Sequence, residues 1–268
     1  CIENNTMSFE DYLNCRRFSL IVHLFTNSVF LPLIKLIKEE LHVSLFEFVK
    51  AVFDSLEKNN NKEYLNTNST NNFSKIYSEF SRECEQELFD SKEDIYEFYS
   101  KDENYNKLLS TELGDNLLRK YSVKIICNAF TEAINLSIDL IPDMIAKDGL
   151  SEDDTKGILN SLKLWLTNLY VFDALFDWDK EKNNETEISI EFDVPAWYKS
   201  DQKSILNFKK KTDYKLIYNK RNEQLKDEIM TLFDSGDYEF SVGKYFHQMG
   251  VTSDDIKRSS VQLPVRSW

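Results

Sequence analysis

Residues 117–145 read LLRKYSVKIICNAFTEAINLSIDLIPDMI, and this stretch decides the fold class. Apolar residues lie on nearly every side of it at helical spacing, which is typical of a helix enclosed by other helices. A second stretch of the same kind, ILNSLKLWLTNLYVFDALF, covers residues 158–176. We therefore expect these two segments to be the central helices of a mainly α fold.

Helical spacing of apolar residues also covers the first part of the chain. Stripes run through residues 18–29, 30–41, 45–56 and 73–88, and Pro32 marks a kink or boundary between the first two. Five segments of the form Ser/Thr-x-x-Asp/Glu predict helix starts, because their side chains can accept hydrogen bonds from first-turn amides. These segments begin at Ser8, Ser44, Ser91, Ser151 and Thr252.

Two regions depart from the helical pattern. Residues 59–72, NNNKEYLNTNSTNN, are almost without apolar side chains and are predicted to form an exposed loop. After Lys180, residues 188–194 and 214–218 alternate between apolar and polar, which predicts two half-buried strands, and a helix is predicted over 225–233. We predict a multi-helix body over residues 1–182, then a small α+β unit over 183–268 with two or three short strands.

The composition fits a folded, helical chain. Apolar residues make up 41% of the 268, with 19 Phe and 13 Tyr, so a large core is expected despite the net charge of −13. Only 6 Gly and 4 Pro are present, too few for many tight turns. The 4 Cys form no CxxC pair or Cys/His cluster, which favours reduced, cytoplasmic thiols. Charged residues interrupt the most apolar N-terminal region, so no membrane span is expected.

The first residue, Cys1, leaves two interpretations open. The chain can be a domain excised from a longer protein, or a secreted protein whose mature form begins at a lipid-bearing cysteine. We prefer excision, because no signal region is visible.

Two pairs of residues are candidates for metal or acid/base chemistry. Glu39 and His42 have the spacing found in di-iron helical bundles, but one copy is not enough, and an ordinary helix end is the preferred interpretation. Asp173 and Asp177 share a helix face after an apolar segment. A buried pair would have raised pKa values suited to proton transfer, but the solvated end of a helix is preferred.

Arg16, Arg17, His23 and Trp197 are candidates for contact with a ligand or another domain. The paired guanidinium groups could bind a phosphate or carboxylate, although surface ion pairs with Glu10 or Asp11 are preferred. His23 lies between apolar neighbours and is interpreted as a core histidine rather than a proton shuttle. Trp197 follows Pro195 directly after a predicted strand and is expected to cover the sheet edge.

Residues 199–226 hold nine Lys or Arg against three Asp or Glu, a local charge of +6 that leaves −19 in the rest of the chain. The segment could dock on an anionic surface of a partner or of its own protein, although a solvated loop is preferred. The acidic remainder argues against nucleic acid as a partner.

Residues at both ends carry a family resemblance. The stretches are MSFEDYLNCRRFSLIVHLFTNSVFLPLIKLI (7–37), VSLFEFVKAVFDSL (43–56), FDVPAW (192–197), DYKLIYNKRNEQLKDEI (213–229) and GKYFHQMGVTSDDIKRS (243–259). Together they resemble the region after the catalytic barrel of radical S-adenosylmethionine enzymes, particularly those with an N-terminal cobalamin-binding domain. The resemblance covers about half of the chain, and residues 57–191 match only as helical.

The family's functional signatures are missing here. The sequence has neither the CxxxCxxC cluster motif nor the DxHxxG cobalamin motif, and it also lacks GxGxxG, GxSxG, HExxH and a phosphate loop. We therefore expect no catalytic, cofactor or metal site in this chain. The resemblance implies a non-catalytic accessory domain that packs on an upstream barrel of the same polypeptide and shapes its substrate cavity or assembly. That barrel would hold a four-iron four-sulfur cluster and S-adenosylmethionine, and cobalamin in the subset that binds it.

Two other functions remain open. The first is a helical binding or scaffold protein, lipid-anchored at Cys1 or soluble, with no enzymatic activity. The second is a helical metal enzyme built around Glu39, His42, Asp173 and Asp177, which we rank last.

Overall fold

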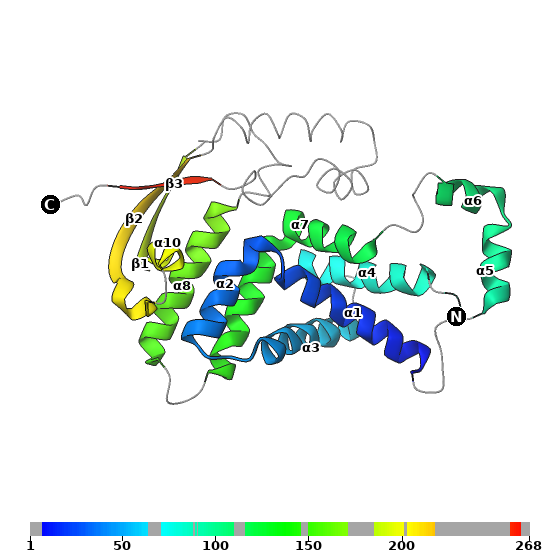
Figure 1. Cartoon of the computed structure of the whole chain (residues 1–268), viewed down its shortest axis with the longest axis horizontal. Helices are drawn as coiled ribbons and strands as arrows, with labels where there is room; N and C mark the ends of the chain where they lie inside the picture. The colour runs from blue at the N-terminus through cyan, green and yellow to red at the C-terminus, as the bar shows by residue number, and fades with distance from the viewer. Residues whose placement is uncertain are drawn as a thin grey trace.

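The computed structural model describes residues 7–63, 71–87, 89, 91–109, 116–145, 150–170, 185–200, 203–217 and 258–263. Within them the chain is mostly helical, and a small three-stranded antiparallel sheet follows near the C-terminus (Figure 1), which confirms the predicted fold class. The boundary expected near residue 182 lies outside the described residues.

The helical part begins with α1 (Phe9–Phe25), η1 (Ser28–Phe30), α2 (Leu31–Lys35), the π-helix η2 (Leu36–Glu40), α3 (Leu45–Glu63) and α4 (Asn72–Glu87). It continues with α5 (Lys92–Tyr99), α6 (Asp102–Leu109), α7 (Leu117–Leu140), η3 (Ile141–Met144) and α8 (Glu152–Leu169). The C-terminal unit contains β1 (Glu185–Phe192), α10 (Val194–Lys199), η4 (Ile205–Phe208), β2 (Lys209–Ile217) and β3 (Ser259–Gln262).

The helix α7 is the centre of the body, as its all-round apolar sequence predicts. It packs against α4, α1, α3 and α8 (Figure 1). The second predicted central helix, 158–176, corresponds to α8, but α8 begins earlier and ends at Leu169, and residues 171–176 lie outside the described part of the chain. The helix α8 lies between α7 and the sheet and contacts both α7 and β1. One hydrophobic core therefore runs from the helical body into the C-terminal unit, and it includes fully buried Phe30, Phe48 and Phe80 together with Phe192 and Trp197.

Four of the five predicted helix starts are confirmed. Ser8, Ser91 and Ser151 each accept a hydrogen bond from the backbone amide three residues later at 3.1 Å, and Ser44 accepts one from Glu47 at 3.4 Å. The fifth start, at Thr252, lies outside the described residues. Side-chain capping is a local interaction, which is why the sequence predicts it well.

The segment from α1 to η2 is bent by 66°, but the break lies between Phe25 and Ser28 and not at Pro32, where the sequence predicted it. Pro32 occupies the first turn of α2, where its missing N–H costs nothing, so the helical path continues past it. The chain then passes through the π-helix η2 and turns at His42, whose φ of 52° is in the left-handed region. This turn directs the chain into α3.

The loop prediction for residues 59–72 is wrong at its edges. The helix α3 continues to Glu63, well beyond its last buried apolar residue Leu56, and α4 begins at Asn72. Residues 64–70 lie outside the described part of the chain. Elongating an existing helix adds one hydrogen bond per residue, so a polar segment can remain helical without a buried face.

The predicted strands 188–194 and 214–218 correspond to β1 and β2, although β1 already ends at Phe192 and Val194 begins α10. Together with β3 they form an antiparallel sheet in the order β1-β2-β3. Residues 188, 190 and 192 face inward toward α8, as their alternation predicts. The contact is tight at Gly157 of α8, where an added Cβ would lie 2.8 Å from the Phe192 ring and 2.9 Å from the Glu191 carboxylate. The third strand, at 259–262, was not located by the sequence pattern.

The helices α5 and α6 form a hairpin that contains no buried residue. Their main packing partners are each other, and they lie beside the far end of the body from the sheet (Figure 1). Near the hairpin, the Tyr99 ring makes edge-on contacts with the rings of Phe89 and Phe98, which contact each other in a tilted arrangement.

One helical segment of the described chain, Leu117–Met144, is long and apolar enough to cross a membrane, and the bent pair Phe9–Phe25 with Ser28–Glu40 passes the same test jointly. Of the apolar window in the first, 56% is buried inside the fold, which also fits a core helix. The expectation that no segment spans a membrane stays a prediction.

Candidate functional site

The structure does not bring the sequence candidates together in one site. Arg16 and Arg17 lie on α1, Trp197 lies on α10, and Glu39 and His42 lie at the end of the π-helix and in the turn after it. Asp173 and Asp177 lie outside the described residues. In the described part of the chain, no three His, Cys, Asp or Glu side chains are grouped closely enough to hold a metal ion.

His23 is not a core histidine, so that interpretation is wrong. Its side chain is exposed, because Ile21, Leu24 and Phe25 form the buried face of α1 and leave residues 22 and 23 outward. Glu39 and His42 are also exposed. Since His42 has left-handed backbone geometry beyond the helix end, the two do not form the one-turn pair that a di-iron site would need.

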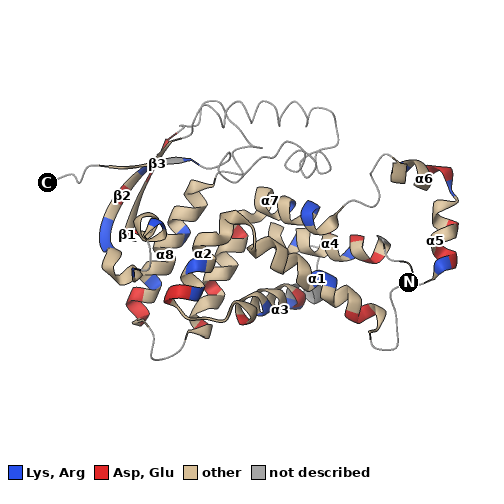
Figure 2. Ribbon diagram, in the orientation of Figure 1, with Lys and Arg blue, Asp and Glu red and all other residues tan. Residues whose placement is uncertain are grey.

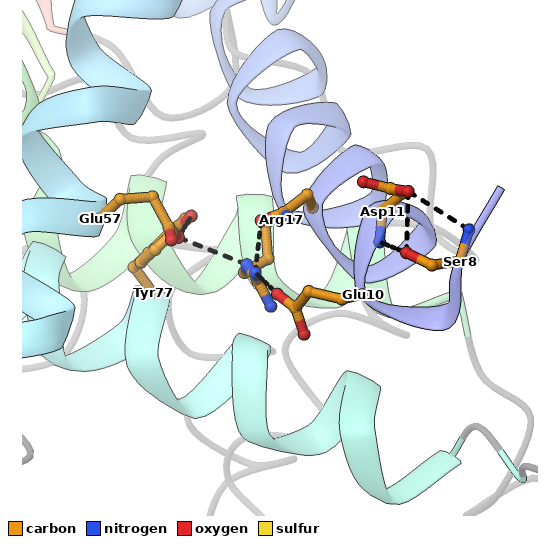
Figure 3. Close-up of polar contacts among 7 residues, drawn as sticks. Ser8, Glu10, Asp11, Arg17, Glu57 and Tyr77 are labelled. Atoms are coloured by element: carbon orange, nitrogen blue, oxygen red, sulfur yellow. Dashed lines mark hydrogen bonds and ion pairs between the residues drawn. The ribbon is translucent and has the colours of Figure 1, made fainter.

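The Arg17 cluster is a polar centre within the helical body, made by Glu10, Asn14, Arg17, Glu57 and Tyr77 (Figure 3). The Nη2 atom of Arg17 donates to Glu10 Oε1 at 2.8 Å and to Asn14 Oδ1 at 2.5 Å. The Nε atom lies 3.3 Å from Glu57 Oε1, an ion pair without hydrogen-bond geometry. The predicted pairing with Glu10 is confirmed, but the Arg17 side chain is only 7% exposed and is not a surface group.

Tyr77 completes the cluster from α4. Its hydroxyl donates to Glu57 Oε1 at 2.5 Å, so the Glu57 carboxylate joins α1, α3 and α4 through two partners. Burial, the hydrogen bond to Glu57 and the charge of that carboxylate raise the pKa of Tyr77 far above its ordinary value. Tyr77 therefore stays neutral over the physiological range and serves as a hydrogen-bond donor.

Arg16 points to a different neighbour. Its Nε donates to the Sγ atom of buried Cys84 at 3.3 Å. Asp11, the other predicted partner of the arginines, instead caps α1 with Ser8 (Figure 3). The two arginines thus contact separate groups and do not form a shared anion site.

The Lys35–Glu40 clamp, which also contains Trp197, Tyr198 and Ser204, joins the helical body to the C-terminal unit. Trp197 is 1% exposed, and its Nε1 donates to Glu40 Oε1 at 2.9 Å. Ser204 donates to the other oxygen of Glu40 at 3.2 Å. The ring of Trp197 therefore faces the segment 35–40 of the body, whereas the sequence predicted a cover for the sheet edge.

Lys35 forms the second half of the clamp. Its Nζ donates to the carbonyl oxygens of Tyr198 at 3.1 Å and Ser200 at 3.2 Å, and it lies 4.9 Å from the centre of the Trp197 ring. The carbonyl oxygens at the end of α10 are favourable partners for a cation. Both charged groups of the clamp, Lys35 and Glu40, therefore have hydrogen-bond partners within the chain.

Asp193 organises the turn between β1 and α10. Its carboxylate accepts from the backbone amide of Ala196 at 3.1 Å and from the Tyr214 hydroxyl at 2.8 Å. Burial, the hydrogen bond to Asp193 and its charge raise the pKa of Tyr214 above the ordinary value. The contact fixes β2 against the start of α10.

Exposed apolar side chains also lie on α1 and α3, where Phe18, Val22, Leu45 and Phe46 form what we call the α1–α3 face. Phe46 is 65% exposed and Val22 40%. The Phe18 ring lies 6.0 Å from the Phe46 ring, and Val22 follows one turn after Phe18 on α1. Scattered single apolar residues are normal on surfaces, but neighbouring ones mark contact sites.

Sequence reasoning missed Glu57, Tyr77, Lys35 and Glu40, because each gains its role from a partner far along the chain. Tyr77 was placed correctly in an apolar stripe, but its hydroxyl carried no signal. Glu40 directly follows the candidate Glu39 at the end of the π-helix, and its role depends on Trp197, 157 residues further along the chain.

Neither a scan against known protein families nor searches of curated proteins and of solved structures found a match for this chain. The resemblance to radical S-adenosylmethionine enzymes therefore rests on the sequence stretches alone.

Proposed function

We propose that this chain is a non-catalytic accessory domain that packs on the catalytic barrel of a radical S-adenosylmethionine enzyme, upstream in the same cytoplasmic polypeptide. The observation that carries the proposal is the exposed α1–α3 face. It lies within residues 7–37 and 43–56, which are the stretches that bear the family resemblance. The iron-sulfur cluster, S-adenosylmethionine and any cobalamin would be held by the upstream domains.

The polar centres support a packing role. In the Arg17 cluster and the Lys35–Glu40 clamp, the buried charges are paired with groups of the same chain. Catalytic groups need at least one open position toward a substrate. Both centres hold helices or units together, which suits a rigid domain that presents a surface to its neighbour.

The apolar face supplies that surface. The exposed fractions of Phe46, Val22 and Leu45 are 65%, 40% and 36%, and the Phe18 ring contacts the Phe46 ring in a tilted arrangement. Large aromatic side chains that remain exposed in one domain are the usual anchors of domain interfaces. We assign the barrel to this face because the face and the resemblance share the same residues.

The first test is the encoding gene. A CxxxCxxC motif in the codons before Cys1 is the expected result, and its absence would contradict the proposal. The second test uses the full-length parent. Phe46→Ser should lower its unfolding midpoint by several degrees, because an anchor is lost from a domain interface.

The control is Leu164→Ser, at an exposed apolar side chain of α8 outside the α1–α3 face. A surface substitution without an interdomain contact changes stability by less than about 0.5 kcal/mol. If the two substitutions lowered the unfolding midpoint equally, the assignment of the barrel to the α1–α3 face would be wrong.

A further inference from the structure

Two exposed surfaces of opposite charge lie at opposite ends of the molecule. The acidic hairpin is residues 91–109, which contain α5 and α6. The basic face is the group Lys199, Lys203, Leu206, Lys210 and Lys211, contributed by α10, η4 and the start of β2. Figure 2 shows the hairpin beyond α4 at one end and the blue start of β2 at the other.

The acidic hairpin exposes apolar side chains that its own fold does not cover. Tyr96 is 66% exposed, Leu109 64% and Tyr105 50%, and neither helix has a buried residue. Each helix has only eight residues. Helices this short are marginal in water without tertiary packing, so the hairpin is suited to gaining stability from a partner.

The rim of the hairpin is acidic. Residues 91–109 hold five Asp or Glu against three Lys. Glu103 pairs with Lys107, and Asp94 accepts the cap contact of Ser91. Three exposed carboxylates, Glu93, Glu97 and Asp102, have no ion-pair partner among the described residues. The exposed Lys92 and Lys101 have none either, so the hairpin as a whole carries a net charge of −2. These three carboxylates are available to a basic surface.

The basic face has the complementary properties. Lys209 pairs with Asp154 and Lys215 with Glu185, so those two lysines are occupied. Lys199, Lys203, Lys210 and Lys211 are exposed without an ion-pair partner in the described part of the chain. Leu206, in η4 between Lys203 and the start of β2, is 43% exposed and adds an apolar side chain to this face.

We propose that the acidic hairpin of one copy docks on the basic face of a second copy of this chain. The two surfaces match in charge and in apolar content, and their positions at opposite ends of the fold prevent contact within one copy (Figure 2). Because the contact joins two different surfaces, the association is head-to-tail and adds further copies as concentration rises. Nucleic acid fits the basic face poorly, because the chain as a whole carries −13.

The test is sedimentation velocity of the full 268-residue chain over a range of concentrations, with charge-reversed variants. The basic-face variant is Lys199→Glu, Lys203→Glu, Lys210→Glu and Lys211→Glu. The hairpin variant is Glu93→Lys, Glu97→Lys and Asp102→Lys. The wild type should associate, and each variant alone should do so at least about tenfold more weakly.

An equimolar mixture of the two variants, examined in the same sedimentation experiment, tests whether the two surfaces contact each other. It contains an unaltered acidic hairpin with an unaltered basic face, and the two reversed surfaces are again complementary. Association should therefore return in the mixture. Circular dichroism must show wild-type helix content in both variants, and any variant that fails this check is replaced by its single substitutions.

The matched control reverses four exposed lysines elsewhere, namely Lys38→Glu, Lys58→Glu, Lys75→Glu and Lys156→Glu. It has the same net charge as the basic-face variant but leaves the basic face unchanged. It should therefore associate like the wild type, whereas association as weak as that of the basic-face variant would show that overall charge repulsion weakens it. A wild type that stays monomeric, or a mixture that fails to associate, overturns the proposal. So does a basic-face variant that associates like the wild type, because hairpins would then pair with hairpins.

Discussion

The Arg17 cluster and the Lys35–Glu40 clamp are both polar centres in an otherwise apolar core, but they are built from different partners. In the cluster, a buried guanidinium depends on carboxylates from α1 and α3. In the clamp, Lys35 binds backbone carbonyls, and Glu40 accepts from neutral donors of the C-terminal unit. Removing a carboxylate from the cluster takes a partner from the Arg17 cation, whose side chain is only 7% exposed. Removing a donor from the clamp instead affects the partly exposed Glu40 carboxylate.

The fold should be more sensitive to substitutions in the Arg17 cluster than to substitutions in the clamp. Buried charges that lose a partner are among the most destabilising changes in proteins, because the remaining charge keeps its desolvation cost. Single hydrogen bonds at a boundary between two units contribute less. We therefore expect the helical body to depend more on its polar centre than the attachment of the sheet does.

The largest effect is expected for Arg17→Met. It removes the cation between Glu10 and Glu57 while keeping much of the side-chain volume, and it should lower the free energy of unfolding by about 3 kcal/mol. Urea unfolding followed by circular dichroism measures the change. Adding Glu57→Gln should recover part of the loss, and a double variant that is no better than Arg17→Met would contradict the ion-pair explanation.

Trp197→Phe should cost about 2 kcal/mol, because the ring shrinks and Glu40 loses the Nε1 donor. Trp165→Phe is the matched control. Trp165 is also buried, but its Nε1 has no hydrogen-bond partner within the described residues. The control substitution should therefore cost clearly less in the same unfolding experiment, and equal costs would show that the clamp's hydrogen bond contributes nothing.

Gly157→Ala should cost about 1 kcal/mol. The new methyl group meets the Phe192 ring at 2.8 Å, and the overpacking exceeds the helix propensity that alanine adds. Asn160→Ala, at an exposed position of α8, should be neutral or slightly stabilising. Thermal unfolding distinguishes the two, and a stabilising Gly157→Ala would mean that β1 does not pack this tightly on α8.

The smallest effect concerns alkaline pH. Tyr77 in the cluster and Tyr214 in the C-terminal unit have pKa values raised above the ordinary 10.0, so the folded state holds their protons more tightly than the unfolded state. Their contribution to stability is complete below pH about 10 and is lost as pH rises further. Tyr77→Phe and Tyr214→Phe should each make the free energy of unfolding fall less steeply above that pH. Unchanged slopes would contradict the raised pKa values of both tyrosines.

Local signals predicted most of the fold. The caps at Ser8, Ser44, Ser91 and Ser151 and the stripes of α7 and α8 each involve neighbours within a few residues, so the sequence pattern contains them directly. The alternation over 188–194 likewise predicted β1. The third strand and the length of α3 depend on pairing and helix elongation, which leave no apolar pattern.

The candidate site was predicted less well, for a related reason. Arg17 and Glu10 are seven residues apart on the same helix, and their pairing was expected. The other two members, Glu57 and Tyr77, come from α3 and α4 and could not be located from neighbouring residues. His23 was assigned to the core from its apolar neighbours, although adjacent residues of a helix point about 100° apart. Tertiary position, rather than residue type, decides which of these groups is buried.

The most direct measurement is photo-cross-linking from position 46 in the full-length parent protein. A benzoylphenylalanine replaces Phe46, and Tyr96 carries the same probe as a control. We predict that the probe at 46 cross-links to peptides encoded before Cys1, while the probe at 96 cross-links only to residues near 199–211 of another copy. A probe at 46 that forms no cross-link to the upstream domain would contradict the claim that this chain acts by docking on a catalytic neighbour.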